Sequence, residues 1–161
     1  MSSQNFTQQL TKTVDELSKP QTLQGLFHEH RDGDPLPSSK ELEEIIELTR
    51  SILFPGFYGM TSVNIQTIRY RIGVDTERLY KLLCRQVMAG FNEDCHCANA
   101  ADTRRCLQEE AERIAENIIL KLPKLRKILS TDVQAAFDGD PAAANLGEVI
   151  DCYPAIKALT N

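Results

Sequence analysis

Residues 131–161 read TDVQAAFDGDPAAANLGEVIDCYPAIKALTN and hold the corner Asp138-Gly139-Asp140-Pro141. An apolar stripe at helical spacing leads into this corner, formed by Leu125, Ile128, Leu129, Val133, Ala136 and Phe137. Gly139 can end a helix in the left-handed conformation, and proline suits the first position of a following helix. Asp140 would then cap that following helix with its carboxylate. The stretch therefore predicts a helix, a sharp turn and a second helix.

The composition of the whole chain favours the same type of structure. The 161 residues are 42% hydrophobic and 25% charged, which is typical of one folded domain. Tryptophan is absent and aromatic residues make up only 6%, so the core must consist mainly of Leu, Ile, Val and Ala. We expect an all-α fold, a bundle of about six to eight helices.

Four further apolar stripes predict helices upstream of the corner, at residues 3–19, 38–53, 62–88 and 102–120. The second of these begins with a capping box at residues 38–41, where Ser38 can accept from a backbone amide three residues on. A mixed segment rich in glycine and proline separates the first helix from the second. We therefore expect residues 1–37 to form an N-terminal helix and linker, and residues 38–161 to form the main helical domain.

Two positions bear on where helices break. Gly73, followed by Asp75, leaves two interpretations open: a break with Asp75 as a new N-cap, or one long helix that tolerates the glycine at a cost of roughly 1 kcal/mol. Leu122-Pro123 interrupts the stripe that ends near residue 120. Because proline is accepted in the first turn of a helix, this pair predicts a new helix from Pro123.

The charge pattern argues against several classes of partner. The chain has 18 basic and 23 acidic residues, a net charge of −5. Its densest basic stretch, at residues 121–127, is interleaved with Leu122, Leu125, Ile128 and Leu129, as expected for the solvated face of an amphipathic helix. We expect no nucleic-acid surface, because such surfaces show a clustered basic face. No apolar run approaches the roughly 18–20 residues of a membrane span, and residues 1–6 do not resemble a secretory signal. We therefore expect no membrane partner and a cytoplasmic location.

Cysteine and histidine invite a metal interpretation at two places. One candidate group is Cys95, His96, Cys97 and Cys106, but zinc sites use paired ligands at C-x₂₋₄-C spacing from two arms, which these residues lack. His28 and His30 stand two residues apart, and such a pair does not share a helix face. We predict no metal ligand. One alternative function stays open, a stand-alone helical interaction module that senses thiol state or metal in the Cys95–Cys106 region.

Two parts of the C-terminal stretch carry a resemblance to a known family. The run at residues 131–143, followed by Tyr153-Pro-Ala-Ile-Lys-Ala-Leu-Thr-Asn161, resembles the helical N-terminal region of serine O-acetyltransferase. Residues 53–59, Leu-Phe-Pro-Gly-Phe-Tyr-Gly, and the run at 80–87 resemble a branch of this family with a long helical extension. The resemblance covers about residues 40–161 and is strongest from residue 131.

This resemblance implies an enzyme that transfers acetyl from acetyl-CoA to the hydroxyl of L-serine, giving O-acetylserine for cysteine biosynthesis. In the family, the catalytic histidine and its carboxylate belong to a left-handed β-helix of hexapeptide repeats. The sequence contains no such pattern, so we expect this chain to end before the catalytic domain, to carry no catalytic residue and to bind no cofactor. His28, His30 and His96 lie outside every matched motif, and we expect this part to have little activity alone.

The resemblance also implies ligands and partners. The aspartate of the family's Asp-Pro-Ala turn contacts the substrate ammonium group, and the same pocket accepts L-cysteine as a feedback inhibitor. Carried over, that residue is Asp140, and Pro141 and Ala142 shape the wall. The family also implies self-association through the N-terminal helices, as a trimer or a dimer of trimers in the full-length enzyme. O-acetylserine sulfhydrylase is a further implied partner, bound through the C-terminus of the full-length enzyme.

Overall fold

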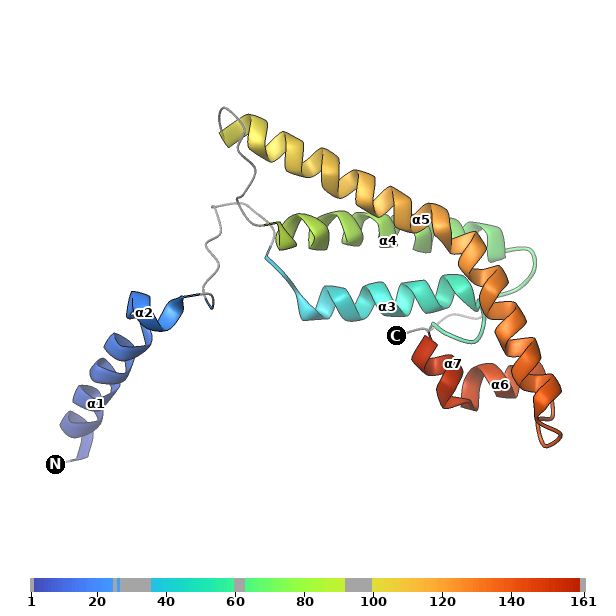
Figure 1. Ribbon diagram of the computed structural model, residues 1–161, viewed down its shortest axis with the longest axis horizontal. Coiled ribbons are helices and arrows are strands. Elements are labelled where there is room, and N and C mark those ends of the chain that lie inside the picture. Colours follow the sequence, from blue (N-terminus) through green and yellow to red (C-terminus); the bar gives the residue numbers. More distant parts are fainter. Residues whose placement is uncertain (1, 25, 27–35, 60–62, 92–99, 160–161) are drawn as a thin grey trace. The chain divides into compact units, whose positions relative to one another are not determined.

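The computed structural model describes residues 2–24, 26, 36–59, 63–91 and 100–159. The chain divides into two compact units, Met1–Asp34 and Pro35–Asn161. The described residues form seven helices and no strand, so the predicted all-α class is confirmed (Figure 1). None of the helices in this part of the chain combines the length and apolar character that crossing a membrane requires.

The first unit contains α1, Ser2–Leu17, and α2, Pro20–Leu23. Pro20 follows the end of α1 and occupies the first turn of α2, where its missing N–H costs nothing. The apolar stripe of α1 is formed by Phe6, Leu10, Val14 and Leu17, whose exposed fractions lie between 51% and 68%. Helix α1 is therefore amphipathic, and its apolar side is exposed.

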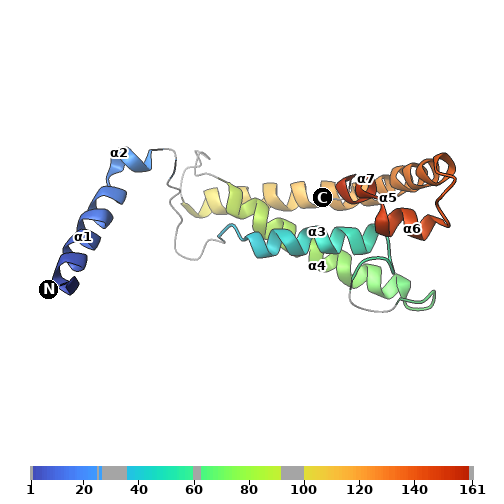
Figure 2. The same cartoon turned by 90° about the horizontal axis from the view of Figure 1, so that it is seen from below.

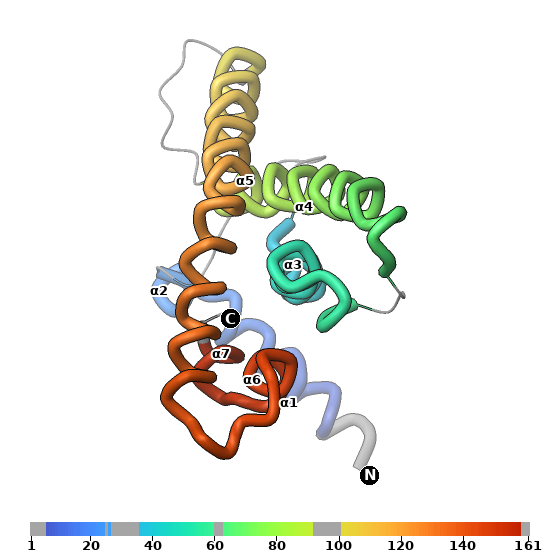
Figure 3. Tube along the Cα trace, turned by 90° about the vertical axis from the view of Figure 1, so that its right-hand side faces the viewer, coloured from blue at the N-terminus to red at the C-terminus, as the bar shows by residue number. Residues whose placement is uncertain are grey.

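The second unit is built around α3, Ser39–Leu53, α4, Ile68–Gly90, and α5, Ala100–Gly139. Figure 3 shows α3 nearly end-on below α4, with α5 running across the side of both. Their facing stripes form one core, made of Leu48, Ile52, Leu53, Phe54, Leu79, Leu82, Leu83, Ala115, Leu122, Leu129 and Val133, together with residues of the last two helices. Leucine, isoleucine and valine supply most of this core, in agreement with the Leu, Ile, Val and Ala core that the composition predicted.

The capping box at the start of α3 has a role in tertiary structure as well. The Ser38 hydroxyl accepts from the Glu41 backbone N–H at 3.3 Å, as predicted. The Glu41 carboxylate instead accepts from the Gln86 side chain at 2.6 Å and pairs with Arg85, also at 2.6 Å. The backbone N–H of Ser38 donates to the Gln86 side-chain oxygen at 3.0 Å. The first turn of α3 is thus bonded to the last turns of α4.

Helix α4 continues through Gly73, which decides the alternative that the sequence left open. Asp75 is no N-cap: it is buried, with 4% of its surface exposed. Its carboxylate accepts from Arg71 at 2.9 Å and from the Ser51 hydroxyl of α3 at 3.4 Å. A buried carboxylate is tolerated when it is paired and hydrogen-bonded in this way, so Asp75 links α4 to α3.

Helix α4 begins later than its apolar stripe suggested, at Ile68 rather than near residue 62. The Asn64 side chain accepts from the backbone N–H groups of Gln66 and Thr67, both at 3.0 Å. Asparagine competes in this way with helical backbone bonds, which explains the later start.

Helix α5 is continuous, so the new helix predicted from Pro123 is wrong. Proline removes one backbone bond and bends a helix, and Figure 1 shows α5 changing direction along its length. Leu122 and Leu129, on either side of the bend, are both buried in the same core. The burial of both halves of α5 therefore outweighs the free-energy cost of Pro123 inside the helix. In the first half of α5, Ala115 is fully buried, whereas Ile118 is 38% exposed.

The chain ends in two short helices, α6, Leu146–Cys152, and α7, Pro154–Leu159. Figure 2 shows them beside the C-terminal half of α5. Val149, Ile150 and Ile156 bury their side chains in the common core. Tyr58 lies in the turn that follows α3, and its hydroxyl donates to the Ile150 carbonyl of α6 at 3.1 Å. These contacts fix both helices next to the end of α5, where the corner lies.

Candidate functional site

The corner at residues 138–141 is a turn and not the start of a helix. Helix α5 ends at Gly139, which does not have the positive φ that was expected of it. Asp140 accepts with its carboxylate Oδ1 from the Ala142 backbone N–H at 2.9 Å, and its carbonyl accepts from the Ala143 N–H at 3.1 Å. Aspartate commonly builds such side-chain turns, and this one replaces the helix predicted from Pro141.

Helix α6 begins five residues after Pro141 and has a cap of its own. The Asn145 side chain accepts from the Glu148 backbone N–H at 3.0 Å. The Glu148 carboxylate reaches back to the Ala144 N–H at 2.8 Å. The pattern Asn145-x-x-Glu148 is a capping-box variant, a local signal from which the start of α6 is predictable.

A tyrosine that sequence reasoning missed completes the corner. The Tyr153 hydroxyl donates a hydrogen bond to the other carboxylate oxygen of Asp140, Oδ2. Tyr153 lies between α6 and α7, and its ring packs partly buried against the core. No local pattern connects two residues 13 positions apart across a turn and a helix, so only the fold brings them together.

These two hydrogen bonds set the charge of the corner. The bond from Tyr153, aided by the Ala142 N–H, lowers the pKa of Asp140 below its ordinary value of 3.8. The same bond raises the pKa of Tyr153 from 10.0 to about 12. Asp140 is therefore a carboxylate and Tyr153 a phenol at neutral pH. Each carboxylate oxygen keeps a second acceptor position, so Asp140 can also accept from a ligand ammonium group.

The structure brings the three predicted site residues together at one surface. Asp140 is half-buried, and Pro141 and Ala142 are exposed beside it. Asp138, near the end of α5, is exposed and accepts from the Gln134 side chain at 2.8 Å. At this surface, the carboxylate that the Ala142 N–H and the Tyr153 hydroxyl hold in place is that of Asp140 and not that of Asp138.

The metal candidates give no site in the part of the chain that the structure describes. Cys95, His96 and Cys97 lie outside the described residues, as do His28 and His30. Cys106 is exposed on α5. Among residues 2–24, 26, 36–59, 63–91 and 100–159, no three metal-ligating side chains gather. Thiol or metal sensing in the Cys95–Cys106 region stays a prediction.

Tyr153→Phe is expected to raise the pKa of Asp140 toward 3.8, because the strongest bond to the carboxylate is lost. A carboxyl with a lowered pKa stabilises the fold above about pH 3.8, and this contribution disappears as the pH falls through its folded value. The raised pKa of Tyr153 acts in the other direction. Its contribution is complete below pH 10.0 and is lost as the pH rises through about 12.

The measurement is an NMR titration of the Asp140 carboxyl carbon in both proteins. Tyr70→Phe is the matched control, since Tyr70 is 77% exposed on α4 and its loss should leave that titration unchanged. An Asp140 pKa that is the same in Tyr153→Phe and in the unsubstituted chain would contradict the assigned hydrogen bond.

The sequence of this chain is similar to that of one curated protein. No protein-family model matches the chain. A plasmid serine acetyltransferase from Synechococcus elongatus is 32% identical to it over 127 residues. The alignment covers 78% of this chain and 40% of that protein, so the chain spans less than half the length of the relative it matches. The resemblance that the sequence motifs indicated is confirmed, and the chain is related to the serine acetyltransferase family.

Proposed function

We propose that this chain is a helical part of a serine acetyltransferase, which transfers the acetyl group of acetyl-CoA to the hydroxyl of L-serine. The observation that carries this proposal is the 32% identity to a protein of that name over 127 residues. In the reaction, the acetyl carbon leaves the sulfur of coenzyme A and bonds to the serine oxygen. A general base takes the hydroxyl proton, which the departing thiolate finally receives. We assign neither the base nor the acetyl-CoA site to this chain.

We assign Asp140 to the ammonium group of L-serine and of the inhibitor L-cysteine. Three features of the corner support this assignment: the low pKa of Asp140, its position at the surface, and the two hydrogen bonds from Ala142 and Tyr153 that fix its orientation. A carboxylate that is already oriented loses little entropy when a ligand binds. Pro141 and Ala142 would form the adjoining wall, because both are exposed next to the carboxylate.

Asp140→Ala, introduced into the full-length enzyme, should raise the KM for L-serine and the inhibition constant for L-cysteine together. Losing a charge-assisted hydrogen bond costs about 1.5–3 kcal/mol, which corresponds to roughly a ten- to hundredfold change in each constant. The KM for acetyl-CoA should not change. The measurement is steady-state acetyl transfer with L-serine, with and without L-cysteine.

The matched control is Asp138→Ala, which removes an exposed carboxylate two residues away and should leave both constants unchanged. If the folded Asp140→Ala enzyme keeps its serine KM and its cysteine inhibition, Asp140 does not hold the ammonium group. If the unsubstituted full-length protein acetylates no L-serine, the proposed activity itself is wrong.

A further inference from the structure

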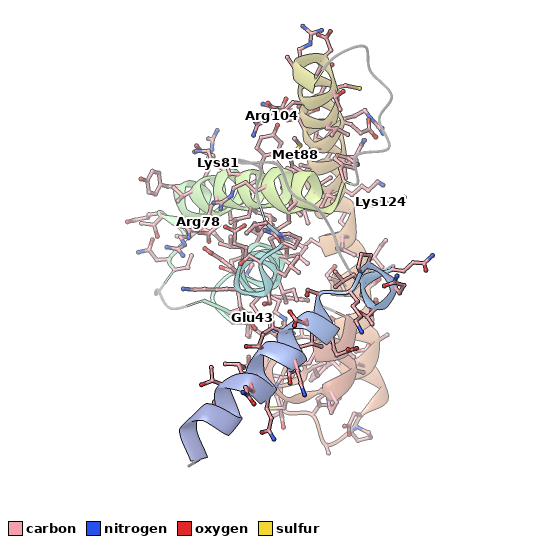
Figure 4. All side chains as sticks on the ribbon, turned by 90° about the vertical axis from the view of Figure 1, so that its left-hand side faces the viewer. Glu43, Arg78, Lys81, Met88, Arg104 and Lys124 are labelled. Carbon is pink, nitrogen blue, oxygen red and sulfur yellow. The ribbon has the colours of Figure 1, made fainter. Side chains whose placement is uncertain are left out.

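A hollow of about 230 Å³ lies between the C-terminal half of α4 and the N-terminal half of α5, and we call it the α4–α5 hollow. Figure 4 shows Met88 of α4 and Arg104 of α5 close to each other at this place. The hollow is lined by Cys84, Arg85 and Met88 of α4 and by Arg104, Gln108, Ala111 and Glu112 of α5.

The size of the hollow limits what it can hold. Pockets for larger ligands measure about 300–1,000 Å³, so this one fits a small metabolite. A cavity of about 150 Å³ holds benzene, which has six non-hydrogen atoms, and in proportion this hollow has room for roughly nine.

Two guanidinium groups, those of Arg85 and Arg104, line the hollow. Arg85 also pairs with Glu41 at 2.6 Å. A guanidinium carries five N–H donors in a planar fork, so an arginine that holds one partner can still bind an anion. The fork matches the geometry of a carboxylate, which makes a carboxylate the natural anion for this wall.

Glu112 supplies the opposite charge from the same helix as Arg104. Arg104, Gln108 and Glu112 follow one another at four-residue intervals and therefore share one face of α5. The Gln108 amide donates to the Glu112 carboxylate at 3.0 Å, which orients the carboxylate. Burial raises the pKa of the Cys84 thiol, and the charge of Glu112 raises it further, so this carboxylate lies close to the thiol. An ammonium group would find an oriented acceptor here.

The remaining lining of the hollow is apolar. Ala111 is 1% exposed, and Cys84 and Met88 are half-buried. The Cys84 thiol, with its raised pKa, stays neutral at pH 7. Thiol and thioether groups are polarizable and adapt to the shape of an aliphatic neighbour. This part of the hollow therefore suits an uncharged, apolar side chain.

We propose that the α4–α5 hollow binds an α-amino acid with an aliphatic or thioether side chain, such as L-leucine or L-methionine. The carboxylate pairs with Arg85 and Arg104, the ammonium group with Glu112, and the side chain packs on Met88. A zwitterion satisfies both signs of charge in the lining. A simple anion would face the Glu112 carboxylate without a partner for it, and a simple cation would face two guanidinium groups. Each of the two amino acids has about as many non-hydrogen atoms as the hollow holds.

The test is isothermal titration calorimetry of the 161-residue chain with L-methionine. We expect a Kd between about 10 μM and 1 mM, which is reasonable for so small a ligand. Arg104→Gln and Glu112→Gln should each raise the Kd about tenfold or more, because each removes a charge-assisted contact. Arg105→Gln and Glu109→Gln are the matched controls: both residues are exposed on α5 and do not line the hollow, so both substitutions should have no effect.

Two analogues of methionine test whether both charges are recognised. One is the thioether amine that lacks the carboxylate, and the other is the thioether acid that lacks the amino group. Each should bind at least about tenfold more weakly than L-methionine. If either analogue binds as tightly as L-methionine, the hollow does not recognise a zwitterion.

Cys84 reports where the ligand binds. At saturating L-methionine, alkylation of Cys84 by iodoacetamide at about pH 8 should slow at least about threefold, because the thiol is part of the occupied hollow. The exposed thiols Cys106 and Cys152 should react at unchanged rates, and peptide mass spectrometry follows each cysteine separately. Asp140→Ala should bind L-methionine as the unsubstituted chain does, since Asp140 follows the opposite end of α5.

The inference does not depend on the proposed acetyltransferase activity, because it rests on the lining of the hollow alone. Four results would overturn it: no binding of L-methionine or L-leucine up to about 10 mM, a Kd that Arg104→Gln and Glu112→Gln leave unchanged, binding without protection of Cys84, or loss of binding in Asp140→Ala. Circular dichroism of each variant confirms that its helices are retained.

Discussion

Leu79→Ala is expected to lower the free energy of unfolding by about 2–5 kcal/mol. Leu79 lies on α4 with none of its surface exposed, in the core that α3, α4 and α5 share. Its removal costs the transfer free energy of the deleted atoms and leaves a cavity that rigid helices on either side fill only in part. Few substitutions in this chain should destabilise the second unit more.

Urea denaturation followed by circular dichroism measures this effect. Leu42→Ala is the matched control, because Leu42 is also a helical leucine, on α3, but 48% of its surface is exposed. The control should lose clearly less stability, since part of its side chain is already in water. Equal losses for the two substitutions would contradict the position of the core between the three helices.

Ile156→Ala is expected to cost a similar amount, about 2–5 kcal/mol, and to disturb the corner as well. Ile156 of α7 is 2% exposed and belongs to the same buried cluster as Val149 of α6. Its backbone N–H donates to the Tyr153 carbonyl at 3.1 Å. Loosening α7 should therefore let Tyr153 move away from Asp140, and the pKa of that carboxyl should rise toward 3.8.

The two consequences are measured separately. Urea denaturation gives the free energy of unfolding, and an NMR titration without urea, at a temperature where the variant is folded, gives the pKa of Asp140. Ile118→Ala removes the same atoms from a side chain of α5 that is 38% exposed, so it should cost less and leave the Asp140 pKa unchanged. A destabilised Ile156→Ala protein with an unshifted Asp140 pKa would show that Tyr153 is held in place without α7.

Short sequence patterns predicted those features that depend on hydrogen bonds between residues a few positions apart. The cap of α3 was predictable because Ser38 bonds to an amide three residues away. The buried side of the second half of α5 was predictable in part: Leu129 and Val133 are buried, whereas Leu125 and Ile128 of the same stripe are 39% and 48% exposed. Periodicity fixes the face of a helix, but the width of the buried stripe depends on the neighbouring helices.

The remaining features depend on contacts between distant residues. Pro123 was predicted to start a new helix, but the buried Leu122 and Leu129 on either side of it keep α5 continuous. Gly73 left a break open, and α4 runs through it, with Asp75 and Leu79 buried on its C-terminal side. Asp140 was singled out correctly as a residue at the bend, but its predicted role as a helix cap is wrong because its carboxylate bonds to Ala142 and Tyr153. The pairing with Tyr153 follows from the docking of α6 and α7, which no short pattern encodes.

The order in which helices of the second unit meet has a consequence for folding kinetics. Most of the helix–helix contacts join neighbours in sequence: α3 with α4, α4 with α5, α5 with α6, and α6 with α7; α3 with α5 is the main exception. Low relative contact order of this kind allows helical domains to fold within milliseconds or faster, on the order of 10⁻⁶ to 10⁻³ s. The unit Pro35–Asn161 should thus fold quickly, because most of its native contacts form between helices that are consecutive in the sequence.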